Sequence, residues 1–105
     1  LEASRHNRDR VHEQLSREAQ LALEELRLAH RRFVSARREH EITADNYRLA
    51  TEKHQAGGLS SNRLLEIETT LTAAESNLAA ARTDYYIAES RYLYAVGSDR
   101  LEEGI

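Results

Sequence analysis

The sequence predicts an all-α fold, a long antiparallel coiled-coil hairpin of two helices. Apolar residues recur at alternating spacings of three and four along the chain, which is the pattern of a coiled coil. Proline is absent from the 105 residues, and the step Gly57-Gly58 is the one break in the pattern before about Val96. Charged residues make up 31% and hydrophobic residues 40%, a balance typical of coiled coils rather than of globular cores.

The first helix is predicted over residues 1–56. Its apolar seam combines large members with small ones: Leu15, Ala19, Ala22, Leu26, Ala29, Phe33, Ala36, His40, Thr43, Tyr47, Ala50 and His54. Large residues opposite small ones let two helices approach closely and interdigitate. This helix is therefore expected to pack along its whole seam against a partner helix.

The hairpin tip is predicted at residues 57–60. Glycine is the usual left-handed helix stop, because it lacks the Cβ that penalises a positive φ. Ser60 is a good N-cap for the next helix. Leu59 and Leu64 then occupy the two positions of a hydrophobic staple. The chain is expected to reverse direction within these few residues.

The second helix is predicted over residues 61–96, with residues 97–105 beginning a following connection. Its seam runs without a miss through Leu64, Ile67, Leu71, Ala74, Leu78, Ala81, Tyr85, Ala88, Tyr92 and Ala95. The tyrosines at 85, 86, 92 and 94 are expected to be packing residues with a wet hydroxyl. The chain opens in mid-pattern without a start Met, so we expect it to be one hairpin of a larger protein.

A second apolar stripe lies beside the seam on each helix. It comprises Leu21, Leu28, Ile42, Leu49 and Ala56 on the first helix and Leu65, Ala79, Tyr86 and Leu93 on the second. Helices that are apolar on two flanks need neighbours on two sides, as in a ring or sheet of helices. The isolated chain is therefore expected to self-associate.

Several function classes are disfavoured by the residues. The chain has no cysteine, and no nucleophile–base pair or phosphate-binding loop is recognisable, so we expect neither an enzyme nor a cofactor. The histidines lack a second facing motif, so no metal site is predicted. The net charge is −3, and glutamates flank the arginines of residues 27–38, so nucleic-acid binding is not expected.

The residues around the tip resemble the TolC-type outer-membrane factor family, specifically the hairpin of its second repeat. The family pattern has an aromatic residue, a glycine, a short polar turn, two acids around a Val-Leu pair, a Leu/Ala heptad run, Ala-Arg-x-x-Tyr and a closing Leu-Gly. Six residues here fall at these spacings without a gap: Gly57, Leu65, Glu66, Arg82, Tyr85 and Gly97. The resemblance covers residues 40–97, and the upstream helix matches by pattern.

This resemblance implies a trimeric exit duct for efflux or type I secretion. Three protomers would form a twelve-helix α-barrel continuing an outer-membrane β-barrel, with this hairpin in the periplasm. The tip residues Gly57, Gly58, Leu59, Ser60 and Leu64 would then dock a periplasmic adaptor and, through it, an inner-membrane pump. The heptad residues Leu26, Phe33, Tyr47, Leu71, Leu78, Tyr85 and Tyr92 would serve as coiled-coil packing.

The residues expected to govern the constriction of such a duct are His54, Arg63, Glu66 and Arg82. The match is partial, because His54 stands where the aromatic is usual, Leu59 where an arginine is usual, and Arg63 where an acid is usual. Any closing network would be built around Arg63, Glu66 and Arg82. In a plainer interpretation, Glu66 and Glu68 are first-turn acids and Arg82 is solvated.

Two other functions stay open at this point. Membrane-fusion adaptors also carry a long coiled-coil hairpin, although their tip has a Leu three residues after an Arg-Leu pair, where this chain has Ile67 after Arg63-Leu64. A structural coiled coil without a transport role is the third interpretation. Flanking amphipathic β-strands would favour a channel, and a lipoyl-like domain would favour an adaptor.

Overall fold

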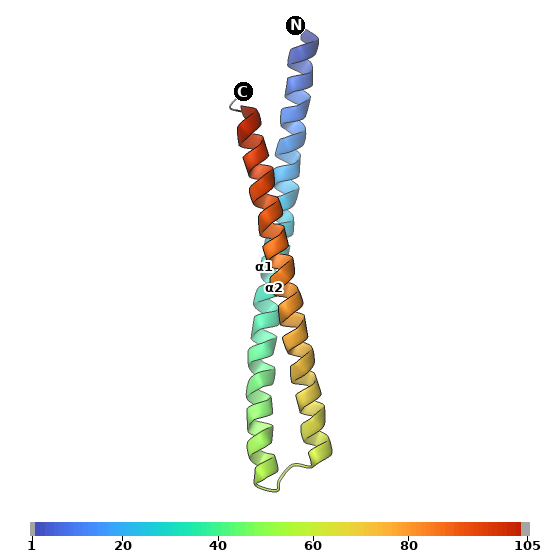
Figure 1. Cartoon of the computed structure of the whole chain (residues 1–105), viewed down its shortest axis with the longest axis vertical. Coiled ribbons are helices and arrows are strands. Elements are labelled where there is room, and N and C mark those ends of the chain that lie inside the picture. The colour runs from blue at the N-terminus through green and yellow to red at the C-terminus, as the bar shows by residue number, and fades with distance from the viewer. Residues whose placement is uncertain (1, 104–105) are drawn as a thin grey trace. The chain divides into compact units, whose positions relative to one another are not determined.

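The chain forms two long helices in a computed structural model that describes residues 2–103, with the side chains of residues 3–97. Helix α1 spans Glu2–Gln55 and helix α2 spans Ser61–Glu103, and residues 56–60 connect them (Figure 1). No strand occurs among the described residues. The predicted all-α helical hairpin is confirmed.

The hairpin divides into two compact units. The tip unit comprises Arg31–Thr83, and the terminal unit comprises the residues up to His30 with those from Asp84 onward. Within each unit a segment of α1 packs against an antiparallel segment of α2. In the terminal unit the ring centroids of His30 and Tyr85 are 5.6 Å apart. Nη1 of Arg91 in α2 lies 4.0 Å from Oε2 of Glu25 in α1.

The inner seam between the helices is the predicted heptad seam. Every seam position named from the sequence is buried or half-buried. The residues that are buried most completely among those described are small ones: Ala22, Ala29, Thr43, Ala50, Ala74 and Ala88. The large members, such as Phe33 and Leu71, are half-buried because they reach over the edge of a seam only two helices wide.

Thr43 is the one buried polar residue in the described part of the seam. Its hydroxyl donates to the carbonyl oxygens of Glu39, at 2.9 Å, and of His40, at 3.1 Å. The polar atom is therefore satisfied within its own helix. Thr43 thus fills a small seam position without needing a partner from α2.

The predicted end of the second helix at Val96 is wrong, because α2 continues through Gly97 to Glu103. Glycine stops a helix by adopting a positive φ, and among the described residues only Gly57 does so. Gly97 stays helical at a cost of about 1 kcal/mol relative to alanine. No proline follows it to force an end.

Candidate functional site: the tip and the flanks

The turn is built by a Schellman motif at the end of α1. The N–H of Gly57 donates to the carbonyl of His54 at 3.0 Å, and the N–H of Gly58 donates to that of Lys53 at 2.8 Å. Gly57 has a φ of +82°, which a residue with a Cβ rarely adopts. Gly58 has no such requirement, since the nearest atom to a Cβ added there would be the Lys53 carbonyl oxygen, at 3.6 Å.

The start of α2 is capped by Ser60, as predicted. Its hydroxyl accepts a hydrogen bond from the N–H of Arg63 at 3.2 Å, and its carbonyl accepts one from the N–H of Leu64 at 3.0 Å. Leu59 is half-buried. Its carbonyl oxygen lies 2.8 Å from Nδ1 of His54.

The contact between His54 and Leu59 assigns the donor role to one imidazole nitrogen. A carbonyl oxygen only accepts hydrogen bonds, so Nδ1 of His54 must carry the proton. The ring thereby closes the turn from the α1 side, at the place where the family pattern has an aromatic residue. In the structure His54 lies in the last turn of α1, and its side chain contacts the backbone of the hairpin turn.

Arg63 and Glu66 form an ion pair one turn along α2, with 2.9 Å between Nη1 and Oε2. Both side chains are about two-thirds exposed, at 62% and 67%. The interpretation of Glu66 and Glu68 as first-turn acids is wrong, because α2 begins at Ser61 and its first turn holds no acid. Both glutamates lie in the second turn.

A groove of about 590 Å³ opens between the helices just above the tip. Asn46, Leu49 and Lys53 line it from α1, and Arg63, Glu66 and Thr70 line it from α2. Leu59 lies at its lower end. The groove thus gathers the tip residues Leu59, Arg63 and Glu66 beside apolar and cationic side chains.

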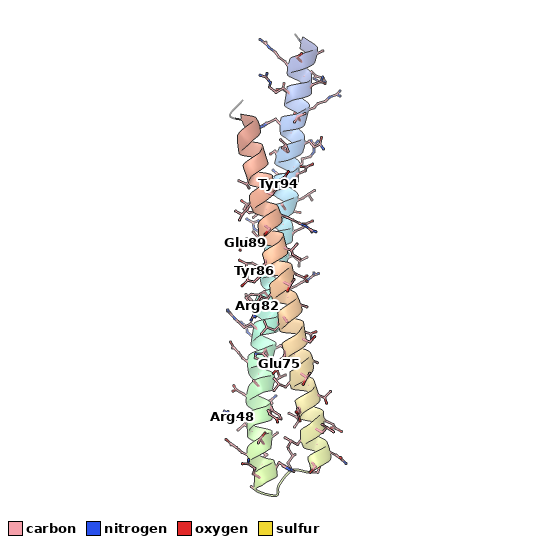
Figure 2. All side chains as sticks on the ribbon, viewed as in Figure 1. Arg48, Glu75, Arg82, Tyr86, Glu89 and Tyr94 are labelled. Carbon is pink, nitrogen blue, oxygen red and sulfur yellow. The ribbon has the colours of Figure 1, made fainter. Side chains whose placement is uncertain are left out.

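Arg82 does not join this group. It lies sixteen residues beyond Glu66 on the same helix, which is about 24 Å along the axis. Its side chain is exposed, and it has no ion pair with any described residue (Figure 2). The structure therefore brings Arg63 and Glu66 together, places His54 against the Leu59 carbonyl, and leaves Arg82 apart.

The second apolar stripe is exposed in both units. In the tip unit the exposed fractions of Ile42, Leu49 and Leu65 are 49%, 48% and 60%. In the terminal unit Leu21, Leu28, Tyr86 and Leu93 are exposed in the same way. Tyr86 and Tyr94 were expected to be packing residues, and the structure leaves both exposed within this chain (Figure 2).

The exposed stripes of the two helices lie on opposite sides of the tip unit. Leu49 of α1 lines the groove together with Glu66 of α2. Successive helical residues point about 100° apart, so Leu65, next to Glu66 and on the other side of the seam, faces away from that groove. We call the side formed by Ser35, Ile42 and Leu49 the α1 flank.

A second feature of α2 was missed by the sequence reasoning. Around Leu65 runs a face with the 3-4 spacing of a seam and no charged residue, which we call the uncharged α2 face: Asn62, Leu65, Thr69, Thr72, Ser76, Ala79 and Thr83. All of its members are exposed. The regular spacing of these residues could have revealed the face, but a search for apolar residues alone does not count threonine and serine.

The threonines of this face have their hydroxyls satisfied within α2. Thr69 donates to the carbonyl of Leu65 at 2.9 Å, and Thr72 and Thr83 donate to the carbonyls four residues earlier, each at 3.1 Å. A threonine bonded in this way turns its methyl group toward the surroundings. The face can therefore be covered without leaving one of these threonine hydroxyls unpaired.

Comparison with known proteins gives no relative for this chain. No protein-family model, no curated protein and no solved structure matches it. In the described residues, neither helix contains a stretch long and apolar enough to cross a membrane, and no group of three or more potential metal ligands occurs.

Proposed function

We propose that this chain is a periplasmic hairpin of an outer-membrane efflux or type I secretion channel, with its tip directed at an adaptor protein. The observation that carries the proposal is the pair of exposed apolar flanks on opposite sides of a hairpin whose inner seam is complete. A helix pair in the wall of a barrel has a neighbour on each side. In the proposed homotrimer, adjacent hairpins cover both flanks.

The tip gives independent support. A turn at the end of a two-helix hairpin contributes little to inner packing, yet this one is ordered by the Schellman bonds of Gly57 and Gly58, the Ser60 cap and the His54–Leu59 contact. Such a turn presents its backbone in one defined shape. Preorganisation of this kind lowers the entropic cost of binding a partner.

In this proposal Arg63 and Glu66 lie next to the docking surface, and Arg82 lies in the tunnel wall higher up. Arg82 lies about 24 Å along α2 from Glu66, so these two residues cannot contact each other, either within one chain or between hairpins whose tips are level. The free guanidinium of Arg82 would reach a carboxylate of the neighbouring hairpin. The partner adaptor would connect the channel to an inner-membrane pump.

Tip substitutions in cells that make the protein test this function. Leu59→Asp and Gly58→Asp should abolish export while leaving trimer assembly and outer-membrane insertion intact, because they put a charge on the docking surface. Asn77→Asp, a similar change at an exposed position away from the tip, is the matched control. A cysteine at position 59 should cross-link to a periplasmic adaptor.

Normal export by both tip variants, with adaptor cross-linking unchanged, would overturn the docking assignment. Arg82→Ala tests the wall separately, and it should raise leakage or conductance by loosening the closed state. Recovery of the protein outside the outer-membrane fraction would favour the two alternatives, an adaptor hairpin or a structural coiled coil. Those two are then separated by whether the protein cross-links to an outer-membrane channel.

A further inference from the structure

We propose that the two sides of the tip unit are complementary to each other, so that the α1 flank of one copy packs onto the uncharged α2 face of a second copy of the same chain. The first argument is size. The α1 flank carries the large side chains Ile42 and Leu49, whereas the α2 face between Leu65 and Thr83 carries only small ones. Large residues on one helix fit the gaps between small residues on another.

The second argument is register. Asn46 and Thr70 line the groove from opposite helices, as do Lys53 and Arg63, and each pair is equally far from the turn at residues 56–60. We therefore take the two members of each pair to lie at the same height along the hairpin. When two copies stand side by side with their tips at the same end, Leu49 of one falls between Leu65 and Thr69 of the other.

The same placement repeats along the joint. One heptad further from the tip, Ile42 falls between Thr72 and Ser76. One heptad further again, Ser35 falls between Ala79 and Thr83. A single alignment therefore places an α1 residue between two α2 residues in three successive heptads, and Ile42 is the large residue that falls between two small ones.

The third argument is the absence of charge. Burying the uncharged α2 face removes no ionised group from water, and the hydroxyls of Thr69, Thr72 and Thr83 are already bonded within α2. Pairing the α1 flank with itself in parallel copies is less favourable, because Arg38, Asp45 and Glu52, which border it, would each lie beside the same charge of the second copy. The α2 face paired with itself would bring together small residues and bury little apolar area.

This contact is heterologous, since each copy offers a different side to each neighbour, and it leads to a ring or an open array rather than a two-fold dimer. The joint runs along the uncharged α2 face from Asn62 to Thr83, so it is about 33 Å long and about 10 Å wide, or roughly 330 Å² per copy. That is below the roughly 800 Å² per partner of a standard stable interface, so a weak association is expected.

Disulfide trapping tests the joint, because the chain has no cysteine of its own. A Leu49→Cys chain mixed with a Thr69→Cys chain under mild oxidation should give mainly the mixed disulfide, and Ile42→Cys with Ser76→Cys should do the same. Leu49→Cys with Ala79→Cys lies two heptads out of register and is the control. The proposal is overturned if disulfides between two copies of the same variant predominate over the mixed disulfide. It is also overturned if the control pair is trapped as readily as the two test pairs.

A charge placed on the face gives a second test. Ala79→Glu should weaken self-association by about tenfold or more, because the carboxylate would be buried unpaired. Ala80→Glu, one residue further on and also exposed, should change it little. Circular dichroism checks that both variants keep their helices, and sedimentation at roughly 100 µM, a concentration suited to a weak interface, measures the association.

The proposed joint would also be overturned if the wild-type chain stayed monomeric in that sedimentation experiment. Equal effects of Ala79→Glu and Ala80→Glu on the association would overturn it too. Neither result would bear on the proposed channel, in which a different hairpin can cover each flank. Loss of export in the tip variants would likewise say nothing about this joint.

Discussion

The inner seam and the outer flanks of this hairpin follow the same seven-residue rhythm, but only the inner seam is covered. Ala74 faces α1 and is 5% exposed, whereas Leu65, displaced round the same helix, is 60% exposed. The repeat thus specifies that a helix will pack, and not which partner it packs against. The difference separates the residues that make the hairpin from those that are left for other molecules.

The seam offers the largest test of this comparison. Ala74→Glu should destabilise the hairpin by about 3 kcal/mol or more, because it forces a larger, charged side chain into the closest contact between the helices. Ala73→Glu, an exposed neighbour, should stay within about 0.5 kcal/mol of the wild-type chain. Urea unfolding followed by circular dichroism, at a concentration where the chain is monomeric, measures both.

Equal destabilisation by the two glutamates would mean that the seam is not the main source of stability. Loss of stability at position 73 alone would place the true seam one residue away. Either result would remove the distinction between covered and uncovered surfaces.

The sequence was sufficient to predict the fold because the seam is periodic. Leu71 and Ala74 lie at a spacing that only a helix presents on one side, and the glycines mark where that helix pair must turn. Gly97 misled the prediction, since the same residue type signals an end only when its φ is positive. The sequence alone does not give that angle.

The candidate site was less predictable. Ser60 was correctly identified as the cap, because capping depends on a local pattern. The contact of His54 with the Leu59 carbonyl depends on how the turn closes in three dimensions, and no spacing rule encodes it. The spacing of the uncharged α2 face is present in the sequence, but the face was not predicted because threonine counts as a polar residue. The structure shows that the threonine hydroxyls are bonded within the helix.

The two glycines of the tip offer a second, smaller test, since the fold of the turn requires a glycine at Gly57 but not at Gly58. Gly57→Ala should cost about 1–2 kcal/mol, because alanine is strained at its φ of +82°. Gly58→Ala should be close to neutral, as its Cβ would meet only the Lys53 carbonyl oxygen at an ordinary contact distance. Thermal unfolding of the two variants measures the difference.

A similar cost at both positions would show that Gly58 also serves the fold of the turn. If instead Gly58→Ala is neutral for folding but reduces export, Gly58 belongs with the residues that the hairpin leaves for a partner. The same substitution then separates a folding role from a docking role at the tip.

The smallest expected effect concerns the ion pair of Arg63 and Glu66. Both side chains are mostly exposed, so their coupling energy in a double-mutant cycle should be below about 0.5 kcal/mol and should fall further as salt is added. The cycle uses Arg63→Gln, Glu66→Gln and the double variant, each followed by urea unfolding. A coupling well above 1 kcal/mol would mean that the pair supports the start of α2. A weak coupling would mean that the stability of the hairpin does not depend on this ion pair. A partner could then bind both side chains without unfolding the hairpin.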